Sequence, residues 1–402
     1  MPPSLPRHRR RPSRSVFLVR RVVVGTAGVA LIVAVVFVVV DLVRSKGHNS
    51  NALVTTTAPG AHGRHGAGSI PKSSTTTKPS NPVTIAAVGD TELGNTPNLP
   101  PDPSTYLQPI ETALSAPIVF GNLEGTLTDQ SSSKCAAGAT NCYAFHTPPS
   151  YAQVLRQAGF TVLNSANNHS HDFGSAGLAD TTAALQAAGI TQTGLPGEIG
   201  VVADGATKVA IVAFGPYSNV NNLLDLTTAK QLIGQARTDA NVVVVYMHAG
   251  AEGSSADHVT GQEETYVGED RGNEKAFAHA AIDDGADLVI ASGPHVLRGM
   301  EFYNGHLIAY SLGDFATYYD FSTSGTLDLS GILKVTLGPN GTFLSGRFVS
   351  LLLDGAGRPS VDPSGSAAQF VNQLSNQDFG SAAATISPNG QIAPGSNPTS
   401  SG

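Results

Sequence analysis

The stretch NVVVVYMHAGAE, residues 241–252, decides the fold class, because an unbroken apolar run is followed directly by a polar segment. A continuous run of this kind is typical of a strand that is buried on both faces, as in a parallel sheet. Similar runs occur at Val83–Gly89, Ala116–Leu123, Thr161–Ala166, Thr207–Phe214 and Ala286–Ser292. We therefore expect each of these runs to be a buried strand.

Amphipathic helix candidates separate these strands, and several of them end at glycine, as a helix C-cap requires. They cover Pro149–Gly159, Ser175–Gly189, Thr227–Asp239 and Asn273–Gly285. The pattern then changes to hairpins, with turns at Asn304-Gly305 and Asn340-Gly341 between alternating strands. The alternation predicts an α/β domain, and the hairpins predict a mixed sheet with antiparallel edges.

The charge of the chain is unevenly distributed. Its 402 residues contain 23 Lys+Arg and 30 Asp+Glu, but the first 80 residues hold 12 of the basic residues and 1 acidic residue, Asp41. The remainder is strongly acidic and would repel nucleic-acid phosphates, so we expect no nucleic-acid partner. Hydrophobic residues make up 41% of the chain, which is enough for a core and excludes a wholly disordered protein.

The N-terminal segment predicts a membrane anchor. Residues 1–21 are rich in arginine, and an uncharged apolar run extends from Val22 to Val40. A helix of about 19 residues spans roughly 30 Å, so we expect one transmembrane helix over residues 22–43. The positive-inside rule would keep the N-terminus in the cytoplasm and leave the C-terminal domain outside the cell membrane. A cleaved signal peptide is the alternative, although the run exceeds the usual signal-peptide core of about 7–15 residues.

Composition divides the rest of the chain into three parts. Residues 44–82 are rich in Ser, Thr, Pro, Gly and His, and are predicted to be a disordered linker. Residues 83–354 carry the strand and helix patterns of the folded domain. Residues 355–402 are predicted to be a low-complexity tail, apart from a short helix candidate near Ala367–Leu374.

Cys135 and Cys142 are the 2 cysteines of the chain, and both lie in a Gly- and Ala-rich segment. A single pair with this spacing makes a poor zinc site. Outside the membrane, such a pair most simply forms a disulfide that closes a short loop.

Polar side chains follow the predicted strands at the point where each strand ends. In open α/β sheets, ligands bind at the carboxyl ends of the strands, so these side chains are candidate functional residues. They lie in the segments Gly89–Glu92, Gly121–Gly125, Asn167–Asp172, His248–Glu252 and Gly293–His295. Each segment alone could be an ordinary turn or cap. Together they supply the carboxylate, amide and imidazole ligands that suit Mn²⁺, Mg²⁺, Zn²⁺ or Fe²⁺, and they predict a divalent-metal site.

The order of these motifs resembles the CapA family of poly-γ-glutamate capsule proteins, whose domain is similar to the metallophosphoesterases. The matching residues are Gly89-Asp90, Asn122–Glu124, Ala166–His169 with Asp172, His248–Glu252, Pro294–Val296 and Tyr310–Phe315. The likeness covers about residues 83–353. It implies a four-layer α/β/β/α sandwich with a metal centre in the loops at one sheet edge.

The resemblance also implies a role for each matching residue. The implied metal ligands are Asp90, Glu124, Asn168, His248 and His295. His169 would protonate a leaving oxygen, and Asp172 would fix its ring. The implied supporting residues around the ligands are Asn122, Asn167, Glu252 and Asp314. Gly293, Glu92 and Asp314 depart from the family pattern, in which His, His and Asn are usual, so one or two cations are expected.

Two functions fit these residues. The first is a membrane-anchored, metal-dependent hydrolase or transferase that acts on a cell-surface polymer or a phosphorylated intermediate, with His169 as its general acid. The second is a non-catalytic binding or assembly component of polymer export, which holds a structural cation in the same cleft. The expected partners are the membrane, an anionic surface polymer or its intermediate, and other components of polymer export.

Overall fold

The structure of the protein is a computed structural model that describes residues 81–140 and 142–395. The predicted cytoplasmic segment 1–21, the predicted transmembrane helix 22–43 and the predicted linker up to residue 80 lie outside the described residues. Within the described ranges, no helix combines the length and the apolar character that crossing a membrane requires.

The first sheet combines parallel and antiparallel strands. Its main order is β19-β20-β17-β16-β1-β2-β5-β6, with β15 paired to β1 and β18 paired to β17. The bounds are β1 Val83–Glu92, β2 Ile118–Leu123, β5 Val162–Asn164, β6 Thr191–Thr193, β15 Asp314–Thr317, β16 Leu329–Leu337, β17 Phe343–Leu353, β18 Pro359–Val361, β19 Ala384–Ile386 and β20 Gln391–Pro394. Strands β1, β2, β5 and β6 are parallel, whereas β16 and β17 extend the sheet in antiparallel fashion.

The second sheet has the order β13-β14-β12-β9-β8-β7. Its bounds are β7 Gly200–Asp204, β8 Thr207–Phe214, β9 Val242–His248, β12 Leu288–Ser292, β13 Met300–Tyr303 and β14 His306–Ala309. The inner strands are parallel, and β7 and β13 are antiparallel edges. Two small ribbons complete the described strands: β3 Thr126–Leu127 with β4 His146–Thr147, and β10 Glu264–Tyr266 with β11 Glu269–Gly272.

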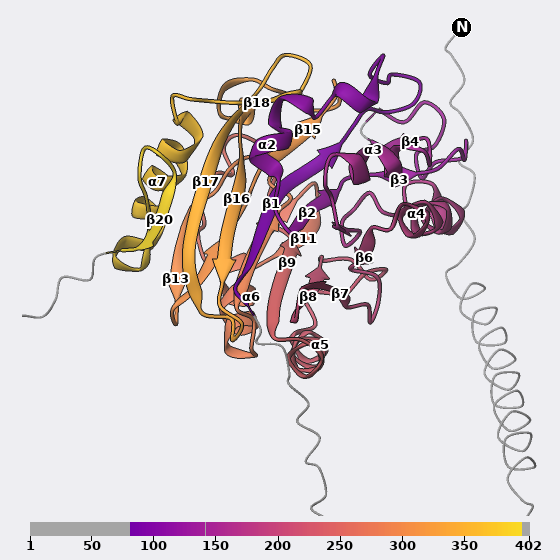
Figure 1. Ribbon diagram of the computed structural model, residues 1–402. Helices are drawn as coiled ribbons and strands as arrows, with labels where there is room; N and C mark the ends of the chain where they lie inside the picture. The colour runs from indigo at the N-terminus through magenta and orange to yellow at the C-terminus, as the bar shows by residue number, and fades with distance from the viewer. Residues whose placement is uncertain (1–80, 141, 396–402) are drawn as a thin grey trace, which may run out of the picture. The chain divides into compact units, whose positions relative to one another are not determined.

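The two sheets pack face to face, and helices cover their outer faces. Side chains alternate along a strand, so one face of each sheet meets the other in a shared core that includes Ile85, Phe120, Ile211 and Tyr246. Helices α2 to α4 pack on the first sheet, and α5 and α6 pack on the second (Figure 1). The helix bounds are α2 Glu111–Leu114, α3 Tyr151–Gln157, α4 Gly174–Ala188, α5 Leu226–Asp239, α6 Glu274–Asp283 and α7 Ser366–Phe379, with 3₁₀ turns at Pro103–Thr105, Gln108–Ile110, Gly325–Asp328 and Gly380–Ala382.

The predicted mixed α/β architecture is confirmed. Each predicted strand is present, and the run 207–214 is β8 without any change of bounds. Both predicted hairpins form, because Asn304-Gly305 joins β13 to β14 and Asn340-Gly341 joins β16 to β17. Gly305 has a φ of 86° and Gly341 a φ of 84°, which is the left-handed backbone that such turns require.

The prediction of a low-complexity tail over residues 355–402 is wrong for residues 359–394, which form β18, α7, β19 and β20. Helix α7, which contains the predicted helix 367–374, places Ala367 and Val371 in the core between the sheets. Ile386 of β19 and Ile392 of β20 join the same core. The apolar residues of this region are few and are spread among Ser, Asn, Gln and Gly, so its composition hides the short elements.

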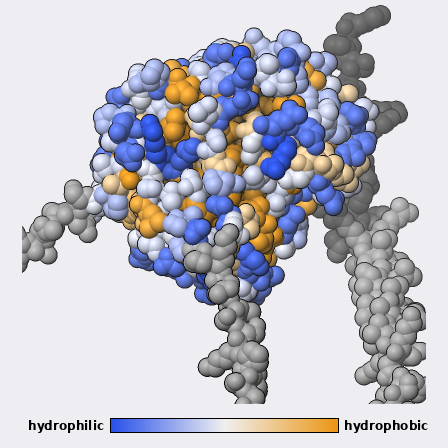
Figure 2. All heavy atoms as spheres, viewed as in Figure 1, coloured by the Kyte–Doolittle hydropathy of each residue, from blue (hydrophilic) through white to orange (hydrophobic). Residues whose placement is uncertain are grey.

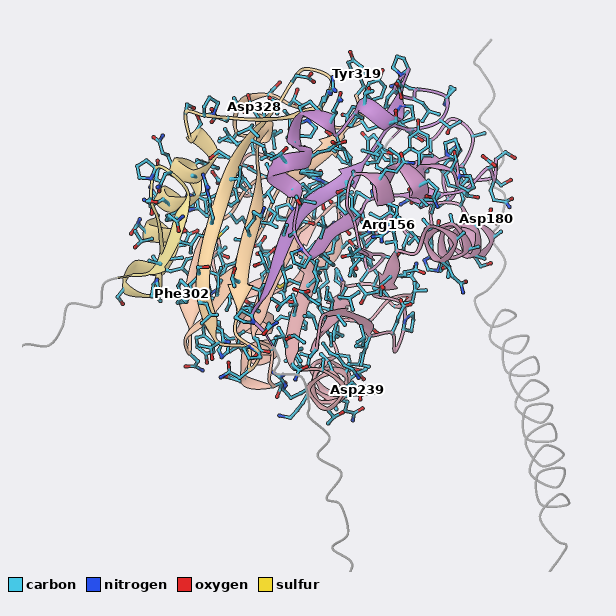
Figure 3. All side chains as sticks on the ribbon, viewed as in Figure 1. Arg156, Asp180, Asp239, Phe302, Tyr319 and Asp328 are labelled. Carbon is cyan, nitrogen blue, oxygen red and sulfur yellow. A yellow bond between two sulfur atoms is a disulfide. The ribbon has the colours of Figure 1, made fainter. Side chains whose placement is uncertain are left out.

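The carboxyl ends of the central strands lie toward one end of this part of the molecule. Tyr319, which closely follows β15, and Asp239, which ends α5, lie at opposite ends of the view (Figure 3). Figure 2 shows hydrophilic residues around the rim of the visible face, with apolar residues between them. Apolar residues scattered in this way are usual on a folded surface. The candidate site therefore has to be sought at the strand ends and not on this face.

Candidate functional site

The carboxyl ends of neighbouring strands bring the predicted residues together. Asp90 of β1 lies opposite Asn122 of β2 and opposite Asp314 of β15. In the second sheet, His248 ends β9 opposite Ser292 of β12. The Ser292 hydroxyl donates a hydrogen bond to Asp90 Oδ1, so the two sheets are joined at this point.

Two groups of ionisable side chains share Asp90. The first contains Asp90, His295 and Asp314, and the second contains Asp90, Glu124 and His248. Within each group, one ligand atom from each residue lies within 4.8 Å of the others. Nδ1 of His295 lies 2.8 Å from Asp314 Oδ1 and 3.1 Å from Asp90 Oδ2. The arrangement offers two neighbouring positions for a cation, with one carboxylate in common.

Asn122 holds the two carboxylates that come from the first sheet. Its Nδ2 donates to Asp90 Oδ1 at 2.7 Å and also donates to Glu124 Oε2. Its Oδ1 accepts from Asn164 Nδ2 at 2.6 Å and from Asn167 Nδ2 at 2.9 Å. Because both partners of Oδ1 are donors, the orientation of the Asn122 amide is fixed.

The remaining implied residues lie around these two groups. Asn168 Oδ1 lies 3.0 Å from Nε2 of His248, and Nδ1 of the same ring lies 3.8 Å from Glu124 Oε2. Glu252 Oε2 lies 3.9 Å from Nε2 of His295. The structure therefore brings every implied ligand and every implied supporting residue to one place. Glu92 is outside both groups, with Oε2 accepting from the Gly94 backbone N–H.

His169 lies beside the second group and is held by Asp172. Its Nδ1 lies 2.7 Å from Asp172 Oδ2, and its Nε2 faces Glu124 Oε1 at 3.9 Å. Asp172 is fixed in turn, because Oδ2 accepts from the Phe145 backbone N–H at 2.7 Å and Oδ1 lies 2.7 Å from Lys134 Nζ. The ring of Phe145 packs on the His169 ring with centroids 4.5 Å apart.

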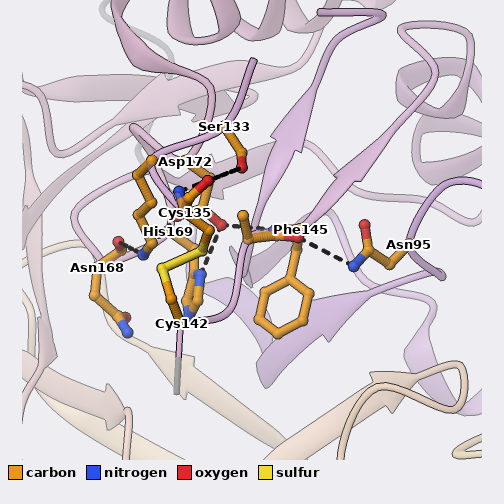
Figure 4. The surroundings of a disulfide bond; sticks show 10 residues. Asn95, Ser133, Cys135, Cys142, Phe145, Asn168, His169 and Asp172 are labelled. Carbon is orange, nitrogen blue, oxygen red and sulfur yellow. Dashed lines mark hydrogen bonds and ion pairs between the residues drawn. A yellow bond between two sulfur atoms is a disulfide. The ribbon is translucent and has the colours of Figure 1, made fainter. Parts of the chain in front are cut away.

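A disulfide between Cys135 and Cys142 closes a loop next to this pair (Figure 4). Lys134 directly precedes the bridge, and its backbone N–H donates to the Asp172 carbonyl at 2.6 Å. Lys134 Nζ also donates to the Asn168 carbonyl at 3.1 Å. The closed loop therefore begins at a residue that contacts two of the predicted functional residues.

Burial and neighbouring charges move the pKa values of the site apart. Burial raises the pKa of Glu124, and the charge of Asp90 raises it further, to well above its usual range. Burial lowers the pKa of His248 to well below its usual value. Burial also lowers the pKa of His295, but Asp314 and Asp90 outweigh burial and raise that pKa well above its usual value. The carboxylate cluster thus favours a positive charge at its centre.

The unpaired oxygens of the cluster fit a cation. Glu124 Oε1 and Asp90 Oδ2 are buried, and neither accepts a hydrogen bond from any residue in the described ranges. A buried carboxylate oxygen without a partner is costly. Coordination to a divalent cation would satisfy both oxygens, and carboxylate with imidazole is a suitable donor set. The residues present therefore fit the predicted divalent metal.

The backbone next to β12 has an uncommon conformation. His295 has a φ of 57°, in the left-handed region that non-glycine residues rarely adopt. Gly293 has a φ of 120°, and a Cβ there would lie 3.0 Å from the Ala249 carbonyl oxygen. The turn thus aims the His295 ring at two carboxylates, and it leaves little room for a side chain at Gly293.

Sequence reasoning missed three residues of the site. Ser292 is the last residue of β12, and its type gives no metal signal. Arg271 lies in β11, in the segment between β9 and α6, and Tyr217 follows β8. The signal for Arg271 is a basic residue in the acidic run GEDRGNE (268–274). Its position next to the site depends on the path of the loop, which the pattern of strands does not reveal.

Comparison with known proteins identifies the family. Residues 84–319 match the family described as bacterial capsule synthesis protein PGA_cap. The chain belongs to this family. The predicted relationship to the CapA capsule proteins is therefore confirmed.

Two curated relatives carry the name CapA. The chain is 31% identical over 260 residues to the PGA biosynthesis protein CapA of Bacillus subtilis (strain 168), which covers 60% of this chain and 62% of that protein. It is 29% identical over 210 residues to the capsule biosynthesis protein CapA of Bacillus anthracis, which covers 47% of each protein. The match thus spans less than two thirds of either relative. Among solved structures, the 5'-nucleotidase precursor of Thermus thermophilus aligns with 74% of this chain and 59% of its own, at 13% identity and a TM-score of 0.37.

Proposed function

We propose that the protein is a metal-dependent hydrolase that acts on an anionic capsule polymer of the polyglutamate kind, or on an intermediate of its synthesis or attachment. The single observation that carries this proposal is the pair of buried acidic and imidazole groups that share Asp90, next to a histidine that is not part of either group. The names of the CapA relatives support the polymer as the setting.

Asp90, Glu124, Asn168, His248 and His295 would hold the metal, and Asp314 is added to this set by the structure. A bound divalent cation would supply hydroxide near neutral pH and polarise the oxygen under attack. The protein contributes the fixed positions of these side chains. Asn122 keeps Asp90 and Glu124 apart and oriented, and Ser292 holds Asp90 from the opposite sheet.

His169 is the proposed proton donor to the leaving group. Asp172 binds Nδ1, so the ring presents Nε2 toward Glu124. A proton held at Nε2 is therefore directed toward the group of oxygens where the reaction would take place. Burial lowers the pKa of His169 although Asp172 raises it, so the ring gives up its proton readily.

A non-catalytic role is the second candidate, and Gly293 favours it. The family pattern usually supplies a histidine at this position, and the glycine backbone at Gly293 supplies no ligand. In this role the same cation would stabilise a binding or assembly component of polymer export.

We also propose that the domain is extracytoplasmic and anchored by residues 22–43. The arginine-rich segment 1–21 and the apolar run that follows it support this orientation. The disulfide between Cys135 and Cys142 fits an oxidising compartment. Protease protection of the chain in intact cells tests this placement.

Metal content tests the proposed function. The full-length chain is supplied with Mn²⁺, dialysed, and measured by mass spectrometry as wild type, Asp90→Ala and His295→Ala. We expect up to two equivalents in the wild type, near-complete loss in Asp90→Ala because Asp90 is shared, and partial loss in His295→Ala. His279→Ala is the matched control, since His279 pairs with Glu301 outside the site. Metal content that neither site variant changes would contradict the assignment, and bound metal without hydrolysis of phosphoester or amide substrates would favour the second candidate.

A further inference from the structure

Arg271 is a buried cation beside the candidate metal centre. Its exposed fraction is 1%. It belongs to β11, and its backbone carbonyl accepts a hydrogen bond from the N–H of Gly250, two residues after His248. The hairpin β10–β11 is thereby joined to the loop that follows β9, so Arg271 stays at the carboxyl end of that strand.

One edge of the Arg271 guanidinium is unpaired. Nη1 donates to Glu252 Oε1 at 2.8 Å, but Nε and Nη2 have no acceptor among the residues that the structure describes. These two N–H groups lie on the same side of the guanidinium and form the edge that binds carboxylate or phosphate in a bidentate manner. Leaving such donors buried and unpaired is costly.

The other buried arginine near the site is fully paired. Arg298 donates from Nε to the Ala256 carbonyl, from Nη1 to Glu274 and from Nη2 to Glu264. The contrast indicates that Arg298 is a structural ion-pair residue. Arg271 retains a binding edge that no described part of the protein uses.

Tyr217 adds a third unpaired donor. Its hydroxyl is buried and has no partner within the described ranges. The Arg271 guanidinium lies 6.0 Å from the centroid of the Tyr217 ring, and the Tyr217 ring lies 6.5 Å from that of His248. Glu252 links Arg271 to the metal centre on the other side, through its 3.9 Å approach to His295. The unpaired donors therefore border the proposed ligands themselves.

We propose that Arg271 and Tyr217 bind an oxyanion group of the substrate, a carboxylate or a phosphate, beside the metal centre. This inference rests on the proposed function, whose substrate it specifies. The oxyanion would take the Nε and Nη2 hydrogens of Arg271 together and a further hydrogen bond from the Tyr217 hydroxyl. In a site lined by carboxylates, these neutral and cationic donors give an anionic substrate a favourable place to bind.

Calorimetric titration of the full-length, Mn²⁺-supplied protein tests the proposal, with inorganic phosphate and glutarate as separate probes. We expect at least one probe to bind the wild type, and the probe that binds more tightly identifies phosphate or carboxylate as the preferred group. Arg271→Gln and Arg271→Lys should each weaken that binding by about 10-fold or more, because lysine keeps the charge but not the bidentate edge. Tyr217→Phe should weaken it about 3- to 10-fold without lowering the unfolding temperature.

Arg237→Gln is the matched control, because Arg237 pairs with Asp287 on the far side of β9 and should leave the affinity unchanged. A purely structural Arg271 would lower the unfolding temperature while the folded variant kept wild-type affinity, and that result overturns the proposal. Wild-type protein that binds neither probe also overturns it. If metal binding and hydrolysis are intact but Arg271→Gln binds the probe normally, this inference alone fails. If the protein lacks hydrolysis but its probe binding depends on Arg271, the proposed function alone fails.

Discussion

Nδ1 of His169 lies 2.7 Å from Oδ2 of Asp172, and this contact sets the direction of the histidine ring. Asp172 is itself held by the Phe145 backbone and by Lys134. With one ring nitrogen occupied, the other is left to face Glu124. The pair has the arrangement of a histidine that is oriented by a carboxylate and exchanges a proton at its free nitrogen.

His169→Ala should lower turnover about 10²- to 10⁴-fold, which is the usual contribution of a general acid. Its metal content should match that of the wild type, because His169 is not among the proposed ligands. Turnover and bound Mn²⁺ are measured on the same preparations.

The control is His171→Ala, two residues along the chain, where the histidine contacts Ser170 and Asn219 instead of the site carboxylates. It should keep both turnover and metal. Equal turnover in His169→Ala and wild type would exclude His169 as the proton donor.

The left-handed backbone of His295 predicts an inverted order of stability for two substitutions. In ordinary helix positions, glycine is less stable than alanine by about 1 kcal/mol. At a φ of 57° alanine pays a backbone cost of about 1–2 kcal/mol that glycine avoids. We therefore expect His295→Gly to be at least as stable as His295→Ala in urea unfolding of metal-free protein, although both lose the ring.

The same pair of substitutions at His279, which lies within α6, is the control and should show the ordinary order. If His295→Gly were less stable than His295→Ala by the amount seen at position 279, the left-handed conformation would not be a feature of the folded protein.

Much of the site was predictable because its residues follow apolar runs. Asp90, His248 and Glu124 each lie at or just beyond the end of a strand that the apolar pattern reveals. Parallel strands bring such ends to one edge, so the sequence predicts that these side chains meet. It does not predict their pairing. That Asp90 is shared by two groups depends on the packing of one sheet on the other and on β15, a four-residue strand with no clear signal of its own.

Arg271 and the C-terminal elements were not predictable for a different reason. Arg271 reaches the site through a hairpin whose strands are three and four residues long, and such short ribbons leave no periodicity to recognise. In residues 359–394, isolated apolar side chains such as Val371 and Ile392 are buried because the edges of two sheets are already there to receive them. Tertiary packing thus decides the structure of segments whose composition is that of a loop.

Gly293 should not tolerate a side chain. Its φ of 120° strains any other residue, and a Cβ would lie 3.0 Å from the Ala249 carbonyl oxygen and 3.1 Å from the Ala249 nitrogen. Gly293→Ala is expected to lower the free energy of unfolding by about 1–3 kcal/mol, and Gly293→His should not add a metal equivalent. Gly253→Ala is the control, since Gly253 has a φ of 103° but open space around it. A gain of bound metal in Gly293→His would show that the turn can accept the missing imidazole.

Glu274 should make the protein less stable as the pH rises from 5 to 8. Burial raises the pKa of Glu274 from 4.5 to about 7, although Arg298 lowers it, and Oε1 is unpaired among the described residues. The folded state therefore keeps a proton that the unfolded state releases above pH 4.5. The resulting stabilisation is complete below that pH and is lost as the pH rises through about 7. Glu274→Gln mimics the protonated form, so its loss of stability between pH 5 and pH 8 should be smaller than that of the wild type by about 2–3 kcal/mol. Urea unfolding of metal-free protein at both pH values measures this difference, and Glu111→Gln, at an exposed position in α2, should follow the wild type. An identical pH dependence in Glu274→Gln and wild type would mean that Glu274 is ionised in the fold and that its pairing with Arg298 outweighs burial.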